Sequence, residues 1–345
     1  MQDNLTPSRK QQHVELCVNE NVIFQRKTNG FERYEFVHNA LPEYNFSEIS
    51  TETEFLGVNC RFPLLLSCMT GGYPQAERIN QELAEICQSF KIPMGVGSQR
   101  QAIENSNYHN SFKITREKAP SIPLLSNIGA PEVAKMKSSV DICRMIDLIK
   151  ADALVVHLNP LQELLQPEGS PDFRGVLSGI ERLVKWLEIP VFVKEVGAGI
   201  SKDVANRLLS VGVKGIDVAG AGGTSWAGVE ILRNSEQDTL SQFWDWGIPT
   251  AECVQQVSLL KDDYNFTLVS SGGILTAMEI ALSIALGADF CASARSMLKA
   301  LFSGGQKELS TLLNQLQLDL KRIMFLVGAV NTEQIRKAGL QKLQN

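Results

Sequence analysis

The chain has 345 residues, of which 44% are hydrophobic and 21% charged, and it contains 26 glycines and 13 prolines. This is the composition of an ordinary globular protein, and it excludes a disordered, collagen-like or coiled-coil chain. With 33 basic and 38 acidic residues the formal net charge is −5, and no basic stripe suits the phosphate backbone of a nucleic acid.

The cysteines and the apolar runs bear on where the protein works. Seven cysteines are scattered without a Cys-x-x-Cys pair, so the sequence predicts neither a disulfide framework nor a zinc or iron–sulfur site. Residues 1–12 lack the apolar core of a signal peptide, and the longest apolar runs, such as 281–286, fall short of the roughly 18 residues of a membrane span. We expect a cytoplasmic protein that is neither exported nor membrane-spanning.

In chain order, short apolar runs with β-forming residues alternate with segments of helical spacing. Between the runs, apolar residues recur three or four positions apart, as at Ile79, Leu83 and Ile86. The eight runs are Pro63–Ser67, Pro93–Gly97, Pro123–Asn127, Ala153–Asn159, Pro190–Val196, Gly215–Gly220, Phe266–Gly272 and Asp289–Arg295.

The runs are almost wholly apolar, which is typical of parallel strands that are covered on both faces. Eight such strand–helix units predict an α/β protein with a (β/α)8 barrel, the TIM-barrel class. A doubly wound open sheet is the alternative, but it would carry one glycine fingerprint after its first strand, whereas here polar or glycine residues follow all eight runs. We expect a single domain with an arm or cap at 1–62, the barrel at 63–300 and C-terminal helices at 301–345.

Three segments lie outside the regular repeat. Residues 1–62 have a polar, basic start and predict an arm that caps the barrel. The stretch 222–249 after strand six, with three tryptophans, is long for a loop of this kind and predicts an active-site insertion. The tail from Gln306 predicts a Leu-rich helix, and Asn331 followed by Gln334 has the pattern of a helix cap.

In a barrel of this type the site lies at the carboxyl ends of the strands, and the last two ends carry glycines and an arginine. Gly272 and Gly273 follow strand seven, and Arg295 follows strand eight. Glycine allows backbone N–H groups to approach a phosphate, so this corner predicts phosphate binding. The alternative is a simple chain turn, but the Gly222-Gly223-Thr224 motif after the preceding strand favours the phosphate.

Lys194 ends a strand that otherwise reads Val-Phe-Val. An ammonium buried there without a partner would be costly, so its charge must face the barrel mouth. A bound anion would satisfy it. The alternative is an ion pair with Glu195 or Asp217.

Four polar residues crowd into seven positions after strand four: His157, Asn159, Gln162 and Glu163. A loop that only connected strand to helix would not need this density, although a single His at a strand end is often a satisfied core residue. Glu163 could supply the one carboxylate that Mg²⁺ commonly takes from a protein when substrate phosphates provide other ligands.

A basic set near the start and after strand two could neutralise a second anionic group. Its members are Arg9, Lys10, His13 and Arg100. The alternative is a solvated terminus.

Eight short motifs follow one another between Ser8 and Arg295. They are Ser-Arg-Lys-x-x-His, Met-Thr-Gly-Gly, Gly-Ser-Gln-Arg, Ser-Asn-Ile-Gly, His-Leu-Asn-Pro-Leu-Gln-Glu, Val-Lys-Glu-Val-Gly, Gly-Gly-Thr-Ser-Trp and Ser-Gly-Gly-Ile. In this order the chain resembles the type 2 isopentenyl diphosphate isomerases. The resemblance implies an isomerase of isoprenoid biosynthesis that interconverts isopentenyl and dimethylallyl diphosphate. It also implies a homotetramer or higher homo-oligomer with FMN, kept reduced by NADPH or NADH, and Mg²⁺.

The resemblance also implies roles for particular residues. Its FMN site implies Met69, Thr70, Ser98, Asn127, Lys194, Thr224, Gly272, Gly273, Ala294 and Arg295. Its substrate site implies Arg9, Lys10, His13, Ser98, Gln99, Arg100, His157, Asn159 and Gln162, with Glu163 on the metal. The catalytic set is Gln162, Lys194, Trp226 and Glu230. One departure is Ala219, which stands where the family pattern has a serine, so one flavin contact is missing from this set.

The reaction that the resemblance implies suits these residues. Moving a double bond requires a proton to be added to an unactivated alkene and another to be removed, and ordinary side chains are poor acids for that task. The resemblance implies that reduced FMN assists, that Lys194 keeps it anionic, and that Gln162 or Glu230 takes part in removing the second proton.

Two rival functions fit a barrel with a phosphate corner. The first is a flavin-dependent 2-hydroxy-acid oxidase, which would need a His as a strong base after a late strand, yet no His follows His157. The second is a phosphate-binding barrel without catalysis, which would need neither the polar cluster after strand four nor a lysine at the mouth.

Overall fold

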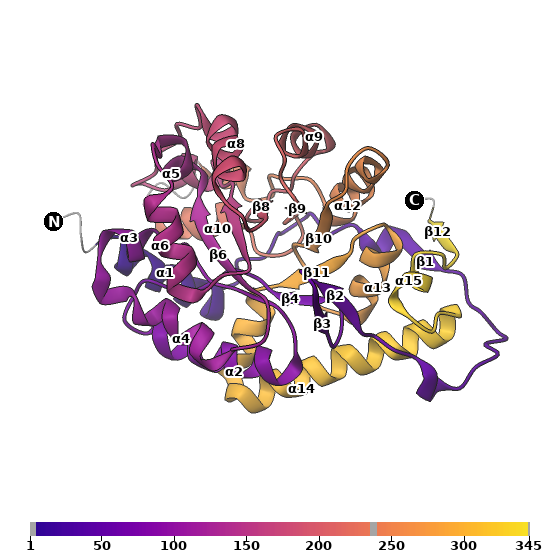
Figure 1. The fold of residues 1–345 in the computed structure, drawn as a ribbon. Helices are drawn as coiled ribbons and strands as arrows, with labels where there is room; N and C mark the ends of the chain where they lie inside the picture. Colours follow the sequence, from indigo (N-terminus) through magenta and orange to yellow (C-terminus); the bar gives the residue numbers. More distant parts are fainter. Residues whose placement is uncertain (1–4, 235–239, 344–345) are drawn as a thin grey trace.

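The computed structural model describes residues 5–234 and 240–343, and its centre is a closed, parallel, eight-stranded barrel (Figure 1). The strands follow one another around the barrel in chain order, and the last pairs with the first. They are β4 (Leu64–Leu66), β5 (Met94–Gly95), β6 (Leu124–Gly129), β7 (Ala153–His157), β8 (Val191–Lys194), β9 (Gly215–Asp217), β10 (Thr267–Ser271) and β11 (Phe290–Ser293). Each of the eight predicted runs coincides with one barrel strand, although β6 extends past its run to Gly129, so the predicted (β/α)8 fold is confirmed.

Helices surround the barrel and occupy the connections between its strands (Figure 1). The α-helices are α1 (Leu5–Asn19), α2 (Ala76–Phe90), α3 (Arg100–Glu104), α4 (Asn110–Lys118), α5 (Ala130–Lys135), α6 (Val140–Ile149), α7 (Pro160–Leu165), α8 (Val176–Trp186), α9 (Lys202–Ser210), α10 (Trp226–Arg233), α12 (Thr250–Ser258), α13 (Ala277–Ala285), α14 (Arg295–Val327) and α15 (Thr332–Ile335). Short 3-10 helices are η2 (Phe31–Arg33), η3 (Phe46–Glu48), η4 (Ser106–Tyr108), η5 (Ser241–Phe243) and η6 (Leu259–Asp262).

Outside the polar residues of β6 and β10 and those at the carboxyl ends, the barrel strands are largely apolar, because successive residues serve two different cores. Val155 and Phe192 point into the barrel with the other members of its internal cluster. Their chain neighbours Val156 and Val193 pack outward against the helices. This two-sided burial is what makes parallel strands read as continuous apolar runs rather than as alternating ones.

The amino-terminal end of the barrel is covered by a hairpin that the sequence analysis did not predict. It consists of β2 (Thr53–Phe55) and β3 (Val58–Cys60), paired antiparallel. The Phe55 ring packs against Phe290 with a centroid distance of 4.8 Å and against Phe192 at 5.9 Å. Both partners stand near the start of their strands, so the hairpin fills the base of the barrel.

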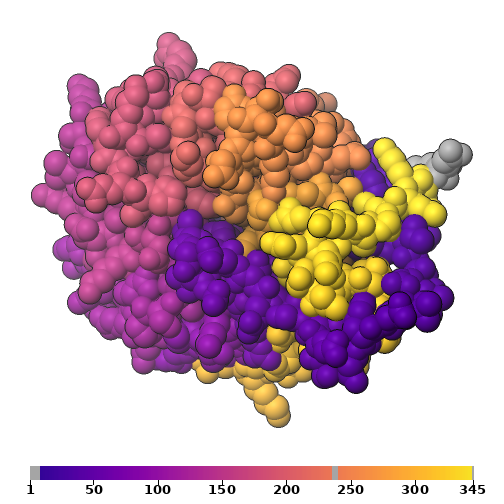
Figure 2. Space-filling model, turned by 45° about the vertical axis from the view of Figure 1, so that its right-hand side comes forward, coloured from indigo at the N-terminus to yellow at the C-terminus, as the bar shows by residue number. Residues whose placement is uncertain are grey.

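The predicted arm, residues 1–62, includes two further features. Helix α1 and the chain that follows it run along the carboxyl ends of the strands, where the Lys10 ammonium donates to Gly71 O and Ser98 O, each at 2.8 Å. Strand β1 (Tyr34–Phe36) pairs antiparallel with β12 (Leu340–Lys342). In Figure 2 the indigo and yellow ends of the sequence accordingly lie against one another.

The predicted tail helix is the second part of α14. The backbone of Gly304 and Gly305 is not helical and separates the first segment, which follows β11 directly, from the Leu-rich one. Asn331 caps α15 by accepting from the Gln334 N–H, while the Gln334 side chain accepts from the Val330 N–H. None of the helices in the described ranges is long and apolar enough to cross a membrane.

Part of the predicted insertion, residues 235–239, lies outside the described residues. Its described part contains α10 and η5, placed between β9 and α12. The Trp244 indole N–H donates to Ile23 O at 2.8 Å, which ties the insertion to the N-terminal arm. The insertion and the arm therefore meet at the carboxyl end of the barrel.

Candidate active site

Lys194 lies buried at the end of β8, with 7% of its surface exposed. Its ammonium donates to the carbonyl oxygen of Glu195 at 2.5 Å. Among the described residues it forms an ion pair with neither Glu195 nor Asp217, the alternative that the sequence left open. Burial raises the pKa of Asp217, and the charge of Lys194 opposes that rise. The Lys194 charge is thus confined at the mouth with a single carbonyl partner.

His157 ends the neighbouring strand β7, and its Nδ1 lies 2.9 Å from Asn127 Oδ1. Burial lowers the pKa of His157 to about 3, with further lowering from the charges of Lys194, Lys10 and Arg9. The ring is therefore neutral at physiological pH. With the amide oxygen facing it, Nδ1 carries the proton and donates, which leaves Nε2 as an acceptor.

Three members of the polar cluster after β7, Asn159, Gln162 and Glu163, are joined by hydrogen bonds. The Asn159 amide nitrogen donates to Gln162 Oε1 at 3.1 Å and to Glu163 Oε1 at 3.0 Å, and Glu163 Oε2 accepts from the Ser170 N–H at 2.8 Å. The buried Asn159 Oδ1 has no partner in the described chain. These are oxygen ligands of the kind Mg²⁺ prefers. The described residues contain no cluster of three or more His, Cys, Asp or Glu that could hold a metal.

A second polar cluster is centred on Glu230, which is fully buried on α10. Its Oε1 accepts from the Gln162 amide at 3.0 Å and lies 2.9 Å from His13 Nε2, while its Oε2 contacts Arg233 at 2.5 Å. The rings of His13 and Trp226 meet edge to face at 5.1 Å. Helices α1, α7 and α10 thus converge on one carboxylate.

The charge state of this second cluster follows from its contacts. Burial raises the pKa of Glu230, but the hydrogen bond from His13 and the charge of Arg233 outweigh burial, so the pKa lies below its usual value. Burial lowers the pKa of His13, opposed by Glu230. At neutral pH the cluster therefore holds an ionised glutamate beside a neutral histidine, an arrangement that can accept a proton.

The basic residues predicted to bind an anion have different surroundings. Burial of the Lys10 ammonium, reinforced by the charge of Arg9, lowers the pKa of Lys10 to about 7. Arg9 Nε lies 3.9 Å from Glu168 Oε1. Arg100 pairs with Glu104 at 2.7 Å and with Glu132 at 3.0 Å.

The predicted phosphate corner is built from closely packed glycine backbone. A Cβ atom on Gly223 would lie 2.3 Å from Gly273 N, and one on Gly272 would lie 2.1 Å from Gly220 O. Only glycine leaves this cradle open, and α14 begins beside it at Ala294 and Arg295. The backbone N–H groups of such a corner suit a phosphate.

Some predicted site residues have side chains already bonded within the protein. The fully buried Gln99 amide donates to Met145 O at 3.1 Å. Arg295 donates to Cys17 O at 2.7 Å and to Glu20 O at 2.9 Å, at the end of α1. Thr70 contacts Asn80 of α2 through its hydroxyl.

The remaining predicted FMN residues lie at the mouth. Met69 and Ser98 are half-buried there, and Thr224 forms an isolated bridge with Ile23 of the arm. Their contact with a ligand stays a prediction.

Sequence reasoning missed Glu195 as a site residue. Its Oε2 accepts from the backbone N–H groups of Val196 and Gly197, both at 2.6 Å, and of Ala198. Burial raises its pKa, opposed by these hydrogen bonds, and Oε1 is buried without a partner among the described residues. A second charged residue directly after Lys194 in an apolar run was the available signal.

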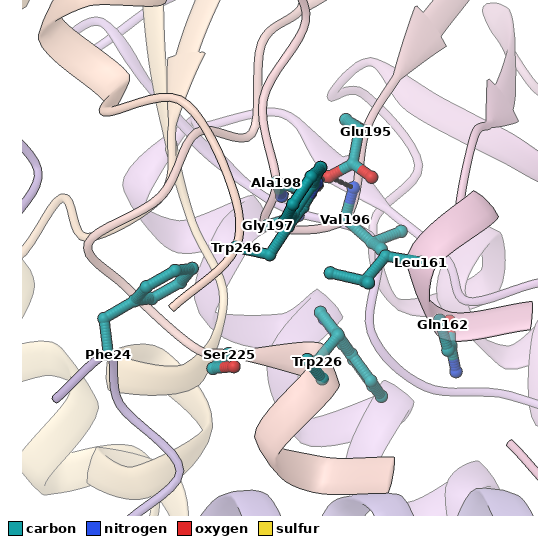
Figure 3. A pocket seen from close by; sticks show the side chains of 11 residues that line it. Phe24, Leu161, Gln162, Glu195, Val196, Gly197, Ala198, Ser225, Trp226 and Trp246 are labelled. Carbon is teal, nitrogen blue, oxygen red and sulfur yellow. Dashed lines mark hydrogen bonds between the residues drawn. The ribbon is translucent and has the colours of Figure 1, made fainter. Parts of the chain in front are cut away.

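A small cavity of about 10 Å³ lies between Glu195 and the insertion. Figure 3 shows Phe24, Trp226 and Trp246 facing this space, with Leu161 and Gln162 to one side. At this volume it can hold about one water molecule. The aromatic side chains thus form one wall of this small space, and Gln162 of the Glu230 cluster also lines it.

A model of the FMN-dependent dehydrogenase family matches residues 2–147 and 156–342 of this chain. The chain is 47% identical to the isopentenyl-diphosphate delta-isomerase of Pelodictyon phaeoclathratiforme, covering 96% of each protein. It is 44% identical to the isopentenyl-diphosphate delta-isomerase of Nostoc sp., covering 98% of this chain and 97% of that one.

Two groups of solved structures share the fold. A mandelate oxidase variant with (S)-mandelic acid is 15% identical with a TM-score of 0.68, over 97% of this chain and 95% of that one. A flavocytochrome b2 variant with pyruvate bound is 16% identical with a TM-score of 0.70, over 95% of this chain and 82% of that one. At such identities the likeness concerns the fold alone.

Proposed function

The chain belongs to the FMN-dependent dehydrogenase family, and from that premise we propose that it is an isomerase of isoprenoid biosynthesis that interconverts isopentenyl and dimethylallyl diphosphate. Relatives 44–47% identical over nearly the whole chain bear the name of this activity. The observation that carries the proposal is the buried, ionised Glu230 beside Gln162 and His13, because an isomerase must remove a proton from a hydrocarbon substrate.

FMN fits the residues at the mouth. The glycine cradle around Gly223 and Gly273 offers room and backbone N–H groups for its phosphate, and the confined Lys194 ammonium offers a positive charge for an anionic ring. When bound and reduced, FMN supplies a proton donor and a negative charge beside the double bond.

The diphosphate of the substrate would bind on the side of the arm. Lys10 and Arg9 on α1 and Arg100 on α3 supply positive charge for it. The neutral His157 ring and the Asn159 side chain, whose amide nitrogen bonds to Gln162 and Glu163, would border the diphosphate without donating to it. Glu163 would hold one Mg²⁺, which would offset the negative charge of the phosphates.

The second proton would leave toward Glu230. Its Oε1 accepts from the Gln162 amide at 3.0 Å, so Gln162 is placed to orient the carboxylate, which would take the proton from the substrate itself. Trp226 lines the small cavity beside Gln162 and would reduce the contact of this region with water.

NADPH as the reductant, a homotetramer and a cytoplasmic location complete the proposal. The seven cysteines, all described, are free thiols, which suits a reducing compartment.

The test is product formation without net oxidation. Purified protein is incubated anaerobically with FMN, Mg²⁺ and isopentenyl diphosphate, with and without NADPH. We expect dimethylallyl diphosphate only with the reductant, and no stoichiometric loss of NADPH. If the protein binds a reducible flavin but forms no dimethylallyl diphosphate, the proposal is overturned and the alternative of a 2-hydroxy-acid oxidase is favoured.

Two variants locate the proton path within the same assay. Glu230→Gln and Gln162→Ala should each lower kcat by about 10²-fold or more, since general acid–base groups contribute roughly 10²–10⁴. Glu181→Gln is the matched control, because this glutamate pairs with Lys185 on the exposed face of α8. Full turnover by either active-site variant would remove that residue from the path.

A further inference from the structure

Arg233 lies at the end of α10 between two carboxylates from different segments. Its Nη1 contacts Glu230 Oε2 at 2.5 Å, and its Nη2 contacts Glu168 Oε1 at 2.8 Å. Its Nε donates to Gln12 Oε1 of α1 at 3.2 Å. The side chain is 11% exposed, so a single guanidinium with all three of its nitrogens engaged links α10, α1 and the connection after α7.

This contact gives the two carboxylate oxygens of Glu230 different partners. Oε2 is occupied by Arg233, so Oε1 is the oxygen turned toward Gln162 and His13. The carboxylate cannot rotate without breaking the pair with Arg233. A guanidinium suits this task because its planar fork holds two carboxylates at fixed angles, which a lysine ammonium does not.

The charged and titratable groups that face Glu230 are few. They are His13 and Cys17 from α1 and Arg233 from α10 itself, while α7 contributes the uncharged Gln162. Cys17 is a buried thiol whose pKa burial raises to about 12, so it remains neutral. Burial also favours the neutral form of His13. Arg233 is therefore the only full positive charge in contact with Glu230 among the described residues.

We propose that Arg233 is a positioning residue for proton transfer: it keeps Glu230 ionised and aims Oε1 at Gln162. This role rests on the proposed isomerase activity, in which Glu230 accepts the second proton. Arg233 itself acts through Glu230. Glu168 holds the far side of the guanidinium and so fixes its plane.

The first test is the pH profile of isomerisation for Arg233→Gln and Arg233→Lys. Without the charge, Glu230 must take up a proton at a higher pH, so the acid limb of kcat for Arg233→Gln should move up by about one pH unit or more. Arg233→Lys restores the charge without the fork. Its acid limb should return toward that of the wild type while its plateau kcat stays several-fold low.

Arg174→Gln is the matched control, because Arg174 forms the same type of ion pair with Asp172 at 2.7 Å but is 91% exposed. It should leave the profile unchanged. Equal loss of kcat at every pH in Arg233→Gln, with no recovery in Arg233→Lys, would reduce Arg233 to a structural role. If the plateau kcat of Arg233→Lys equals that of the wild type, the planar guanidinium is not needed to position Glu230, and the inference is overturned. This outcome can be measured even if Arg233→Gln fails to fold.

A second readout does not depend on activity. Infrared difference spectra of protein labelled with ¹³C-glutamate follow the band of a buried protonated carboxyl group during acid titration. The midpoint should lie higher in Arg233→Gln than in the wild type, and the band should vanish when Glu230→Gln is added. An unchanged midpoint would overturn the inference. Loss of isomerisation by the wild type would instead overturn the proposed function alone.

Discussion

At the residue scale, Lys10 shows how burial tunes a charge for its task. Its ammonium reaches two carbonyl oxygens, Gly71 O and Ser98 O, and its pKa falls from 10.5 to about 7. Carbonyls give the ammonium hydrogen bonds without a compensating charge. A bound anion would supply that charge and raise the pKa of Lys10 again, so the ammonium would become fully protonated when a diphosphate binds.

This gives a pH prediction for anion binding. Above pH 7 the free protein must take up a proton at Lys10 before it pairs with the anion, so affinity for inorganic diphosphate should fall by up to about tenfold per pH unit. Lys10→Arg remains charged and should lack this fall. Isothermal titration of both proteins from pH 6 to 9 measures the effect, and their ratio cancels the ionisation of diphosphate itself. If the affinity of both proteins changes equally with pH, the pH effect does not come from Lys10 and the prediction is contradicted.

The lowered pKa of Lys10 also determines whether its contribution to stability rises or falls with pH. The folded pKa of Lys10, about 7, lies below the unfolded value of 10.5. Between these two pH values the unfolded chain binds more protons, so the contribution of Lys10 to the free energy of unfolding rises with pH across that window and is flat below it.

Single residues were the harder part to predict from the sequence. Lys194 at the mouth followed from a charge at the end of an apolar run, and that reasoning needs only local sequence. Arg295 was predicted to face a phosphate, yet two of its nitrogens bond to the end of α1. No local pattern records that two segments almost 280 positions apart along the chain will meet.

At the element scale, the barrel strands were predictable because each is buried on two faces and therefore largely apolar before its polar carboxyl end. The ends of the helices were less predictable. Lys91 and Lys150 follow the last residues of α2 and α6 as C-caps, and both are in the left-handed conformation, for which glycine is the usual sequence signal. The β2–β3 hairpin was missed because its strands have three residues each and little periodicity.

That hairpin carries a stability prediction. Phe55 is 2% exposed and packs on two rings inside the barrel, so Phe55→Ala should lower the free energy of unfolding by about 3–5 kcal/mol. Urea denaturation followed by fluorescence measures it. Leu41→Ala is the control, because Leu41 is 74% exposed and should change little. A loss below about 1 kcal/mol for Phe55→Ala would mean that the hairpin only covers the base.

At the scale of the whole molecule, segments far apart in the sequence build the site together. The arm, the insertion and the start of α14 meet at the carboxyl end of the barrel, and β1, which contacts α13, pairs with β12. The arm and the insertion were predicted as additions to a barrel. Their mutual contacts depend on tertiary packing and were not readable from either segment.

FMN binding should stabilise this assembly as a unit. A ligand that binds only the folded protein adds about 2.7 kcal/mol at a hundredfold excess over its Kd, so the Tm should rise with FMN concentration. Riboflavin, which lacks the phosphate, should stabilise less, because the glycine cradle at Gly223 and Gly273 would remain empty. Differential scanning calorimetry of the stripped protein compares the two. Equal shifts would contradict a phosphate site in this corner.

The filled interior of the barrel also determines how small molecules reach the site. Because Phe55 and the internal side-chain cluster fill the barrel from its base, the site is approached from the carboxyl ends of the strands. Substrate and product must therefore enter and leave by the same opening, beneath the N-terminal arm. Occupancy by one therefore excludes the other, and accumulated product should inhibit in strict competition with the incoming molecule.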